Sequence, residues 1–483
     1  MYFYSLENTH DNMYASQDPE SDISIIASRY TEAHQSSESI FLDASQWTEL
    51  MEHFMEGMQY TLAVSAADDA GDTYPDNIAV SISRCEVYIY TENTSKAIPI
   101  IKDLTSRHSE MAAVRVLYGM YLSSTGDSRE AIEYYLSAYE EYEDSYRLNI
   151  LLGEEYSSIE NYGMAIRYFQ KSIITDHSDD RVIDMLVEVY IKSESHTLGA
   201  HFFKRLIEKD PYNAKLWRLC GFFLYRKGSI QEALQALEYA TYIATQWSTP
   251  YYDMSEILWE EERYDDIISC LQRLLSYDTI EDPYPYSMLG KCYHQKGEIE
   301  KSCEYFLRAI HYDPLNAEGW YNLSLAHFTS GYKRQALEYI YQGLECDSND
   351  VECLRLAWEI EESLHMWDEA DTHLSTLIEH PESNDDDYMD YAYFLYERGE
   401  YTKALEILKN LRQINENCYE AFYHMSSIYF GIGDYEKGSN MLKKALSLAP
   451  ELLHVIEDNY PELIDRIPLL KQYFPIGDSG KKN

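Results

Sequence analysis

Glycine and proline are scarce in this sequence, with 20 and 13 residues among 483. Both residue types interrupt regular structure and mark turns, so their scarcity argues against a loop-rich all-β chain. Apolar residues make up 45% of the chain, and tyrosine alone accounts for 47 residues. This is enough apolar surface to bury a large core, which excludes a disordered polyanion.

Basic residues are also few. The chain has 39 Lys and Arg against 84 Asp and Glu, a formal net charge of −45. Such a charge repels phosphate backbones and anionic membrane surfaces. An RNA-binding repeat array is therefore the least favoured function, and neither nucleic acid nor a membrane is expected as a partner.

Signals for export, membrane insertion and metal binding are missing as well. No basic residue precedes Arg29, and no apolar segment typical of a secretory signal or a membrane span is present. The eight cysteines stand singly, without CxxC pairs or histidines at zinc spacing. We therefore expect reduced thiols, no disulfides and no metal, in a cytoplasmic protein.

What the sequence does contain is a repeat of 34 residues. Twelve blocks, the seventh with one extra residue, fill residues 44–452. Position 20 of the blocks reads Ala63, Ala97, Ala131, Ala165, Gly199, Ala233, Ile267, Ser302, Ala336, Ala370, Ala404 and Gly438. Eleven of these twelve are small, where composition alone would give roughly a fifth. A small residue is needed where two helices approach closely, so the spacing predicts helix hairpins.

Position 24 is apolar in every block, and positions 20, 24 and 27 lie one helical turn apart. The resulting stripe can be buried only by stacking one hairpin on the next. Three blocks depart from the pattern. The seventh has Ile267 at position 20, and the second and tenth diverge at positions 7 and 8. Local irregularity is expected there.

The pattern resembles the tetratricopeptide repeat (TPR) family. The eighth block carries the family's residue types most completely, at Tyr286, Leu289, Gly290, Tyr293, Ser302, Phe306, Ala309 and Pro314. The resemblance implies an all-α fold, a right-handed α-solenoid superhelix of about twelve helix hairpins with a C-terminal capping helix.

The expected domains follow from this register. Residues 1–43 form an acidic N-terminal segment, read as largely disordered or a short helix, and residues 453–474 form capping helices before a tail at 475–483. The repeat blocks are 44–77, 78–111, 112–145, 146–179, 180–213, 214–247, 248–282, 283–316, 317–350, 351–384, 385–418 and 419–452.

No motif in the sequence indicates catalysis. The stretch Gly477–Lys481 resembles fragments of a serine-protease motif and of a phosphate-binding loop, but it lies in the tail with no strand before it. His196 and His201 are five residues apart, which does not place them on one helical face. We expect neither an enzyme nor a cofactor.

The resemblance implies that partners bind a concave groove lined by the first helix of each hairpin, chiefly at positions 2, 5, 9, 12 and 13. From the fifth to the ninth block the candidate partner-binding residues are Arg181, Lys192, Lys215, Arg218, Phe222, Tyr225, Arg226, Tyr252, Trp259, Lys291, His294, Tyr321 and Phe328. The sixth block has four bases and two acids. Two interpretations stay open: these bases hold an acidic or aromatic peptide, or they pair with groove acids such as Asp184, Glu188, Glu256 and Glu260.

The function expected from these features is a non-catalytic scaffold or adaptor that binds a protein or peptide partner, with a homo-oligomer possible. The alternative is a substrate-docking or regulatory subunit of an enzyme complex. A clamp for chaperone carboxylate tails is disfavoured, because positions 5 and 9 hold pairs such as Ile82 and Glu86 where that clamp needs Lys and Asn.

Overall fold

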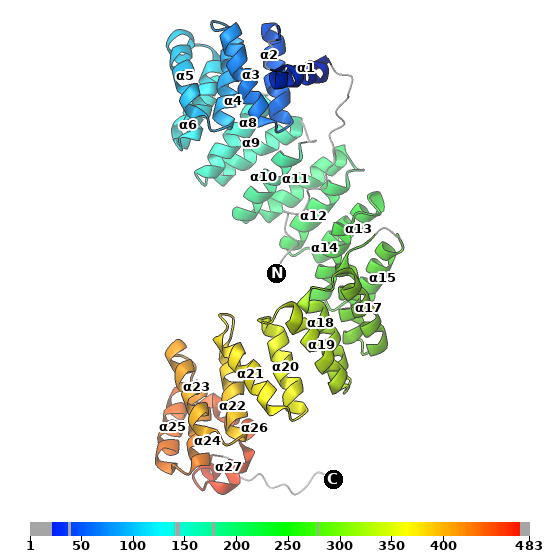
Figure 1. Ribbon diagram of the computed structural model, residues 1–483, viewed down its shortest axis with the longest axis vertical. Helices are drawn as coiled ribbons and strands as arrows, with labels where there is room; N and C mark the ends of the chain where they lie inside the picture. The colour runs from blue at the N-terminus through cyan, green and yellow to red at the C-terminus, as the bar shows by residue number, and fades with distance from the viewer. Residues whose placement is uncertain are drawn as a thin grey trace. The chain divides into compact units, whose positions relative to one another are not determined.

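The computed structural model describes residues 22–36, 40–139, 141, 145–175, 179–277 and 280–473. Every regular element in these ranges is a helix (Figure 1). The chain divides into two compact units, residues 1–253 and 254–483, and the division falls inside α14 (Ser248–Glu260). The expected N-terminal residues 1–21 and the tail at 475–483 lie outside the described residues.

Consecutive helices pair as hairpins in both units. Before the division the helices are α1 (Asp22–Ser36), α2 (Ala44–Glu56), α3 (Tyr60–Thr73), α4 (Ile78–Tyr90), α5 (Thr94–His108), α6 (Ala112–Ser124), α7 (Ser128–Tyr139), α8 (Tyr146–Ser158), α9 (Tyr162–Thr175), α10 (Asp180–Lys192), α11 (His196–Lys209), α12 (Ala214–Arg226) and α13 (Ile230–Ile243).

After α14 the helices are α15 (Tyr264–Leu275), α16 (Pro283–Gln295), α17 (Ile299–Tyr312), α18 (Ala317–Thr329), α19 (Lys333–Cys346), α20 (Val351–Ser363), α21 (Trp367–Glu379), α22 (Asp385–Glu397), α23 (Tyr401–Ile414), α24 (Glu420–Ile432), α25 (Tyr435–Leu448), α26 (His454–Asn459) and α27 (Pro461–Arg466). Helices α2 to α25 make twelve hairpins in the described part of the chain. The predicted all-α fold of stacked hairpins is confirmed.

Several first helices start directly after a capping residue, which is the last residue of the preceding block. Asn77, Ser145 and Asn213 each accept a hydrogen bond at the side-chain oxygen from the backbone N–H three residues later. The side chains of Asp179 and Asp282 cap their helices in the same way, each accepting from the backbone N–H two residues later. Each such bond satisfies a donor that the first helical turn leaves free. The 34-residue period therefore places a capping residue before each of these first helices.

Close packing inside a hairpin depends on small residues at positions 8 and 20. Ala131 and Ala233, both at position 20, are fully buried. A Cβ atom added at Gly290 would lie 2.5 Å from the ring of Phe306, which stands at position 24 of the same hairpin. Ile267 is fully buried too, so the seventh hairpin accommodates a large residue at position 20.

Tyrosines at position 11 connect one hairpin to the one before it. Tyr88 Oη, at position 11, donates to Asp68 Oδ1, at position 25 of the preceding hairpin, over 2.7 Å. At a later junction the two residue types are exchanged: Tyr341 Oη, at position 25, donates over 2.8 Å to Glu361 Oε1, at position 11 of the next hairpin. Burial raises the pKa of Tyr88 to about 12, so the phenol stays protonated and can donate. Position 25 of one hairpin thus meets position 11 of the next, which fixes the stacking register at these junctions.

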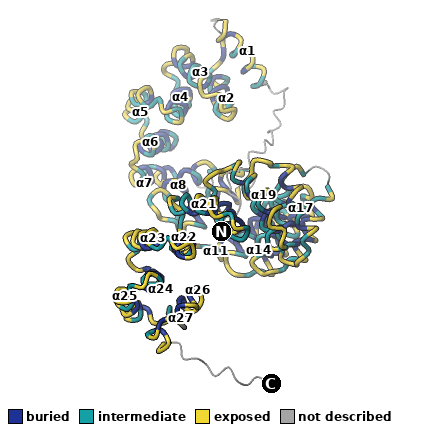
Figure 2. The backbone as a smooth tube through the Cα atoms, turned by 60° about the horizontal axis from the view of Figure 1, so that its bottom comes forward, coloured by how far each residue is buried: buried dark blue, intermediate teal, exposed yellow. Residues whose placement is uncertain are grey.

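The two ends of the array are covered by further helices. Tyr30 of α1 is buried against the ring of Trp47 on α2, with ring centroids 5.7 Å apart. At the other end α24, α25, α26 and α27 lie together (Figure 1). Tyr460 and His424 are both buried there, and Tyr460 Oη lies 2.8 Å from His424 Nδ1. Buried and exposed residues alternate along the helices (Figure 2), as amphipathic helices in a stack require.

Candidate functional site

The predicted groove residues lie on first helices, but the division of the chain separates them. Arg181, Lys192, Lys215, Arg218, Phe222, Tyr225, Arg226 and Tyr252 belong to the first unit, and Trp259, Lys291, His294, Tyr321 and Phe328 belong to the second.

Most bases of the first group have carboxylate partners. Lys215 Nζ lies 2.9 Å from Asp180 Oδ1 and 3.2 Å from Asp184 Oδ1. Lys192 Nζ lies 2.6 Å from Glu188 Oε1, one helical turn away. For Lys215 the geometry corresponds to the second interpretation of the sequence, in which groove acids neutralise the bases.

Arg218 is part of a buried ion pair. Its Nε lies 2.6 Å from Asp253 Oδ2 on α14, and the side chains of Arg218 and Asp253 are only 10% and 2% exposed. Burial raises the pKa of Asp253, and the Arg218 charge and hydrogen bond act against that shift. Arg218 is therefore held inside the seam between α12 and α14, where a partner cannot reach it without opening the packing.

Arg226 is exposed and lies over the Phe222 ring, 5.8 Å from its centroid. In the second unit, Lys291 Nζ pairs with Glu318 Oε1 at 2.6 Å, and His294 Nε2 lies 3.0 Å from Thr329 Oγ1. Burial lowers the pKa of His294 and raises that of Tyr321.

The remaining two residues of that group are aromatic. Trp259 packs edge-on against Tyr264, with ring centroids 5.3 Å apart, and Phe328 is half-buried against the core formed by α19 and α20. Both rings therefore contribute to packing within the second unit.

A group of acids on α20 and α22 was not singled out by the sequence reasoning. Desolvation, followed by the charges of Asp386 and Asp387, raises the pKa of Asp390 to about 6. Desolvation also raises the pKa of Glu359 and of Glu362. Glu359 and Glu362 stand at positions 9 and 12 of their block, so reading the groove positions for acids as well as for bases would have found them, whereas Asp390 stands at position 6 and would still have been missed.

A pocket of about 700 Å³ opens in the first unit. It is lined by Thr48, Met51, Glu52, Met55 and Glu56 of α2, Tyr60 of α3, Ala79, Ile82, Ser83, Glu86, Val87 and Tyr90 of α4, Arg147 of α8 and Arg181 of α10. Most of these residues stand at positions 2, 5, 9, 12 and 13 of their blocks. Of the predicted groove residues, Arg181 lies here. The other residues of this pocket were not predicted from the sequence, because the candidates were chosen among basic and aromatic residues of the fifth to ninth blocks.

The pocket walls differ in charge. Glu52, Glu56 and Glu86 come from α2 and α4, while Arg147 and Arg181 come from α8 and α10. Arg147 Nη1 lies 3.0 Å from Glu86 Oε1, and burial raises the pKa of Glu86 despite that contact. Arg181 is 83% exposed, and its contact is with Asp179, the residue that caps its own helix.

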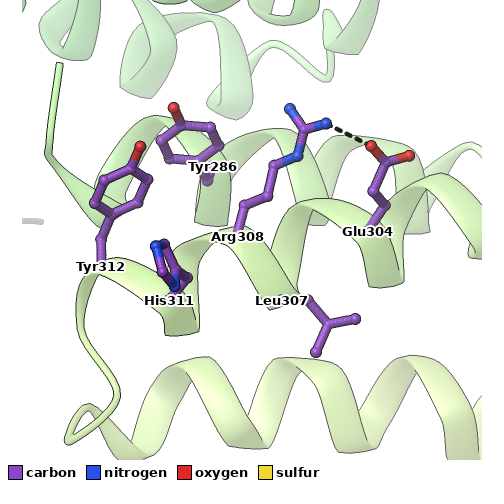
Figure 3. A pocket seen from close by; sticks show the side chains of 6 residues that line it. All are labelled: Tyr286, Glu304, Leu307, Arg308, His311 and Tyr312. Carbon is purple, nitrogen blue, oxygen red and sulfur yellow. Dashed lines mark hydrogen bonds and ion pairs between the residues drawn. The ribbon is translucent and has the colours of Figure 1, made fainter. Parts of the chain in front are cut away.

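A second, smaller pocket of about 490 Å³ lies on α16 and α17 of the second unit. Tyr286 and Tyr312 stack with ring centroids 5.1 Å apart, beside Arg308, whose Nη2 lies 2.6 Å from Glu304 Oε1 (Figure 3). Burial and the hydrogen bond with Tyr312 raise the pKa of Tyr286 to about 12. The guanidinium in this pocket already has a carboxylate partner.

The described residues contain no cluster of three or more His, Cys, Asp or Glu side chains arranged to hold a metal ion. The cysteines are free thiols, and burial raises the pKa of Cys292 to about 12, so this sulfur is not a thiolate at neutral pH. Within the described ranges, no helix has both the length and the apolar character needed to span a bilayer.

Comparisons with known proteins give two family matches. The tetratricopeptide repeat model matches residues 112–145, 146–173, 284–314 and 317–350. The model of anaphase-promoting complex, cyclosome, subunit 3 matches residues 373–445. Both sets of residues lie within the hairpins described above.

Two curated relatives are distant. BBSome complex member BBS4 of Bos taurus is 21% identical over 171 residues, which are 35% of this chain and 32% of that protein. TPR repeat-containing protein YpiA of Bacillus subtilis (strain 168) is 23% identical over 288 residues, 57% of this chain and 66% of that protein. The chain thus spans about a third to two thirds of the length of these relatives.

Among solved structures, this chain is similar to yeast Tom70. The two sequences are 14% identical, and the match has a TM-score of 0.36 and covers 90% of this chain and 99% of that chain. The APC/C hetero-tetramer Cut9-Hcn1 is 15% identical with a TM-score of 0.33, covering 90% of this chain and 98% of that chain.

Proposed function

This chain belongs to the tetratricopeptide repeat family, and from that premise we propose that it is a non-catalytic scaffold or adaptor that binds protein partners on the surfaces formed by its first helices. A stack of hairpins buries one face of each helix against its neighbours and leaves the other faces to line an extended surface. Such a surface can hold a long segment of another protein.

The observation that carries the proposal is the pocket of the first unit. Its wall residues come almost entirely from first helices and combine methionine and isoleucine side chains with acids and arginines. Binding pockets typically join an apolar floor with a few placed polar groups. A pocket of about 700 Å³ is large enough for one or two side chains of a bound segment.

Membership of a larger assembly agrees with the relatives. One family match is named as a subunit of the anaphase-promoting complex, and one curated relative as a member of the BBSome complex. The same observations favour the alternative in part, because a substrate-docking or regulatory subunit of an enzyme complex would use the same surfaces. The net charge of −45 favours protein over nucleic acid as the partner.

Site-specific photocrosslinking in the native cell tests the proposal. A photoreactive residue would replace Ser83 on α4 or Glu359 on α20, both on first helices, and for comparison Lys102 on α5 or Glu338 on α19, both on second helices. The expected result is crosslinks to the same partner from the first-helix positions and few from the second-helix ones. Crosslinks mainly from Lys102 and Glu338 would contradict the proposed binding surface.

A further inference from the structure

We propose that the first-unit pocket binds an extended segment of a partner protein in which an apolar side chain stands between an acidic and a basic residue. The acidic residue meets Arg181, the apolar one meets the floor between α2 and α4, and the basic one meets Glu52. This inference rests on the proposed function and specifies the ligand chemistry of one of its surfaces.

The floor is adapted to an apolar side chain. Met51 is buried, while Met55 and Ile82 are half-buried and face the pocket from two neighbouring first helices. Methionine is unbranched and polarizable, so it adjusts to side chains of different shape. A Leu, Ile, Met or Phe side chain placed here would be removed from water, which favours binding.

Arg181 offers a carboxylate site. Its side chain is 83% exposed, and its guanidinium contacts Asp179, two residues earlier, with 3.1 Å between Nη2 and Oδ2. The Asp179 side chain is only 17% exposed, but it also accepts hydrogen bonds from Tyr146 Oη and from the Arg181 backbone N–H. Asp179 therefore keeps two partners when the Arg181 guanidinium turns to a carboxylate of the bound segment. An arginine can then bind the new carboxylate through two parallel hydrogen bonds.

The acidic residues on α2 favour a basic residue in the bound segment. Arg147 neutralises Glu86 across the pocket, but Glu52 and Glu56 on α2 are exposed. Burial raises the pKa of Glu86, and the charge of Glu52 adds to that shift. A segment carrying acids alone would meet repulsion at this wall, and one carrying bases alone would meet repulsion at Arg181. Complementarity therefore selects a segment with both charges, in a fixed direction across the pocket.

Selection of a displayed library of random linear dodecapeptides on the full-length protein tests the proposal, followed by fluorescence anisotropy with the enriched peptides. We expect peptides with Asp or Glu and Lys or Arg on opposite sides of an apolar residue. Arg181→Glu and Met55→Gln should each weaken binding about tenfold or more. Arg107→Gln is the matched control, because Arg107 is also exposed and paired with a nearby aspartate, but on the second helix α5.

Charge exchange makes the test specific. A peptide whose acidic residue is replaced by Lys should lose binding to the wild type and regain it with Arg181→Glu. A peptide whose basic residue is replaced by Glu should regain binding with Glu52→Lys. Circular dichroism of each variant checks that the helices are intact.

Several results would overturn the proposal: no enrichment, enriched peptides of one charge only, equal binding by wild type and Arg181→Glu, or peptides matching this chain's own sequence, which would indicate a second copy as the occupant. Crosslinks from Ser83 and Glu359 would in those cases still support the proposed function. If the peptides behaved as expected but Ser83 and Glu359 gave no crosslinks, the scaffold function would be contradicted, and the peptide specificity of the pocket would stand.

Discussion

The buried ion pair between Arg218 and Asp253 makes a sharp prediction about stability. Asp253→Ala would leave the Arg218 guanidinium, on a residue only 8% exposed, without this carboxylate. Removing one member of a buried pair typically costs about 3–5 kcal/mol, because the remaining charge is neither hydrated nor paired. In a unit of about 250 residues this corresponds to a fall in Tm of roughly 6–20 °C.

Two comparisons separate this cost from a general effect of charge removal. Lys215→Gln breaks exposed pairs with Asp180 and Asp184 and should cost about 1 kcal/mol or less. The double variant Arg218→Met with Asp253→Leu removes both buried charges and should be far closer to the wild type than Asp253→Ala.

Urea denaturation followed by circular dichroism at 222 nm measures all three variants. If Asp253→Ala shifted the midpoint no more than Lys215→Gln does, the ion pair would not be buried as described, and our reason for removing Arg218 from the accessible groove residues would fail.

Four further outcomes are expected. Ala131→Leu should overpack its hairpin and cost about 1–3 kcal/mol in denaturant titration, and an unchanged midpoint would contradict the register. Tyr135→Phe should stabilise the protein by about 1 kcal/mol, since the Tyr135 hydroxyl is buried without a hydrogen-bond partner; destabilisation would reveal a partner. The folded pKa of Asp390, about 6, is above its ordinary value of 3.8, so its stabilising contribution is full below pH 4 and lost as the pH rises through 6. Asp390→Asn should therefore raise Tm at pH 7.5 but not at pH 4, by a modest amount because solvent screens this exposed side chain. Deleting residues 454–473 should expose the buried face of α24 and cause self-association in light scattering; a stable monomer would refute the capping role.

Sequence periodicity was enough to predict the hairpins. Ala131 and Ala233 recur in phase because two helices cannot approach closely over a larger side chain, and that requirement acts within a single hairpin. Capping residues such as Asn213 act within one helical turn. Both signals are local, so they can be read from residue spacing alone.

The tyrosines at position 11 make contacts between hairpins that the repeat pattern does not predict. Tyr88 and Tyr190 both stand at position 11, and both are buried. The sequence does not show that the Tyr88 hydroxyl bonds to Asp68 of the preceding hairpin. That contact depends on how far one hairpin is shifted along the next, which no single repeat specifies.

The sequence by itself determined the repeat length and the helix pairs, and its resemblance to tetratricopeptide repeats implied which first-helix positions could line a groove. Only the tertiary structure decided which of those positions are accessible. Arg218, at position 5, turns into the seam against α14 and pairs with Asp253, whereas Arg181, at position 2, stays exposed at a pocket. The physical reason is that accessibility and ion pairing are set by the neighbouring hairpin, whose side chains are 30 or more residues away in the sequence.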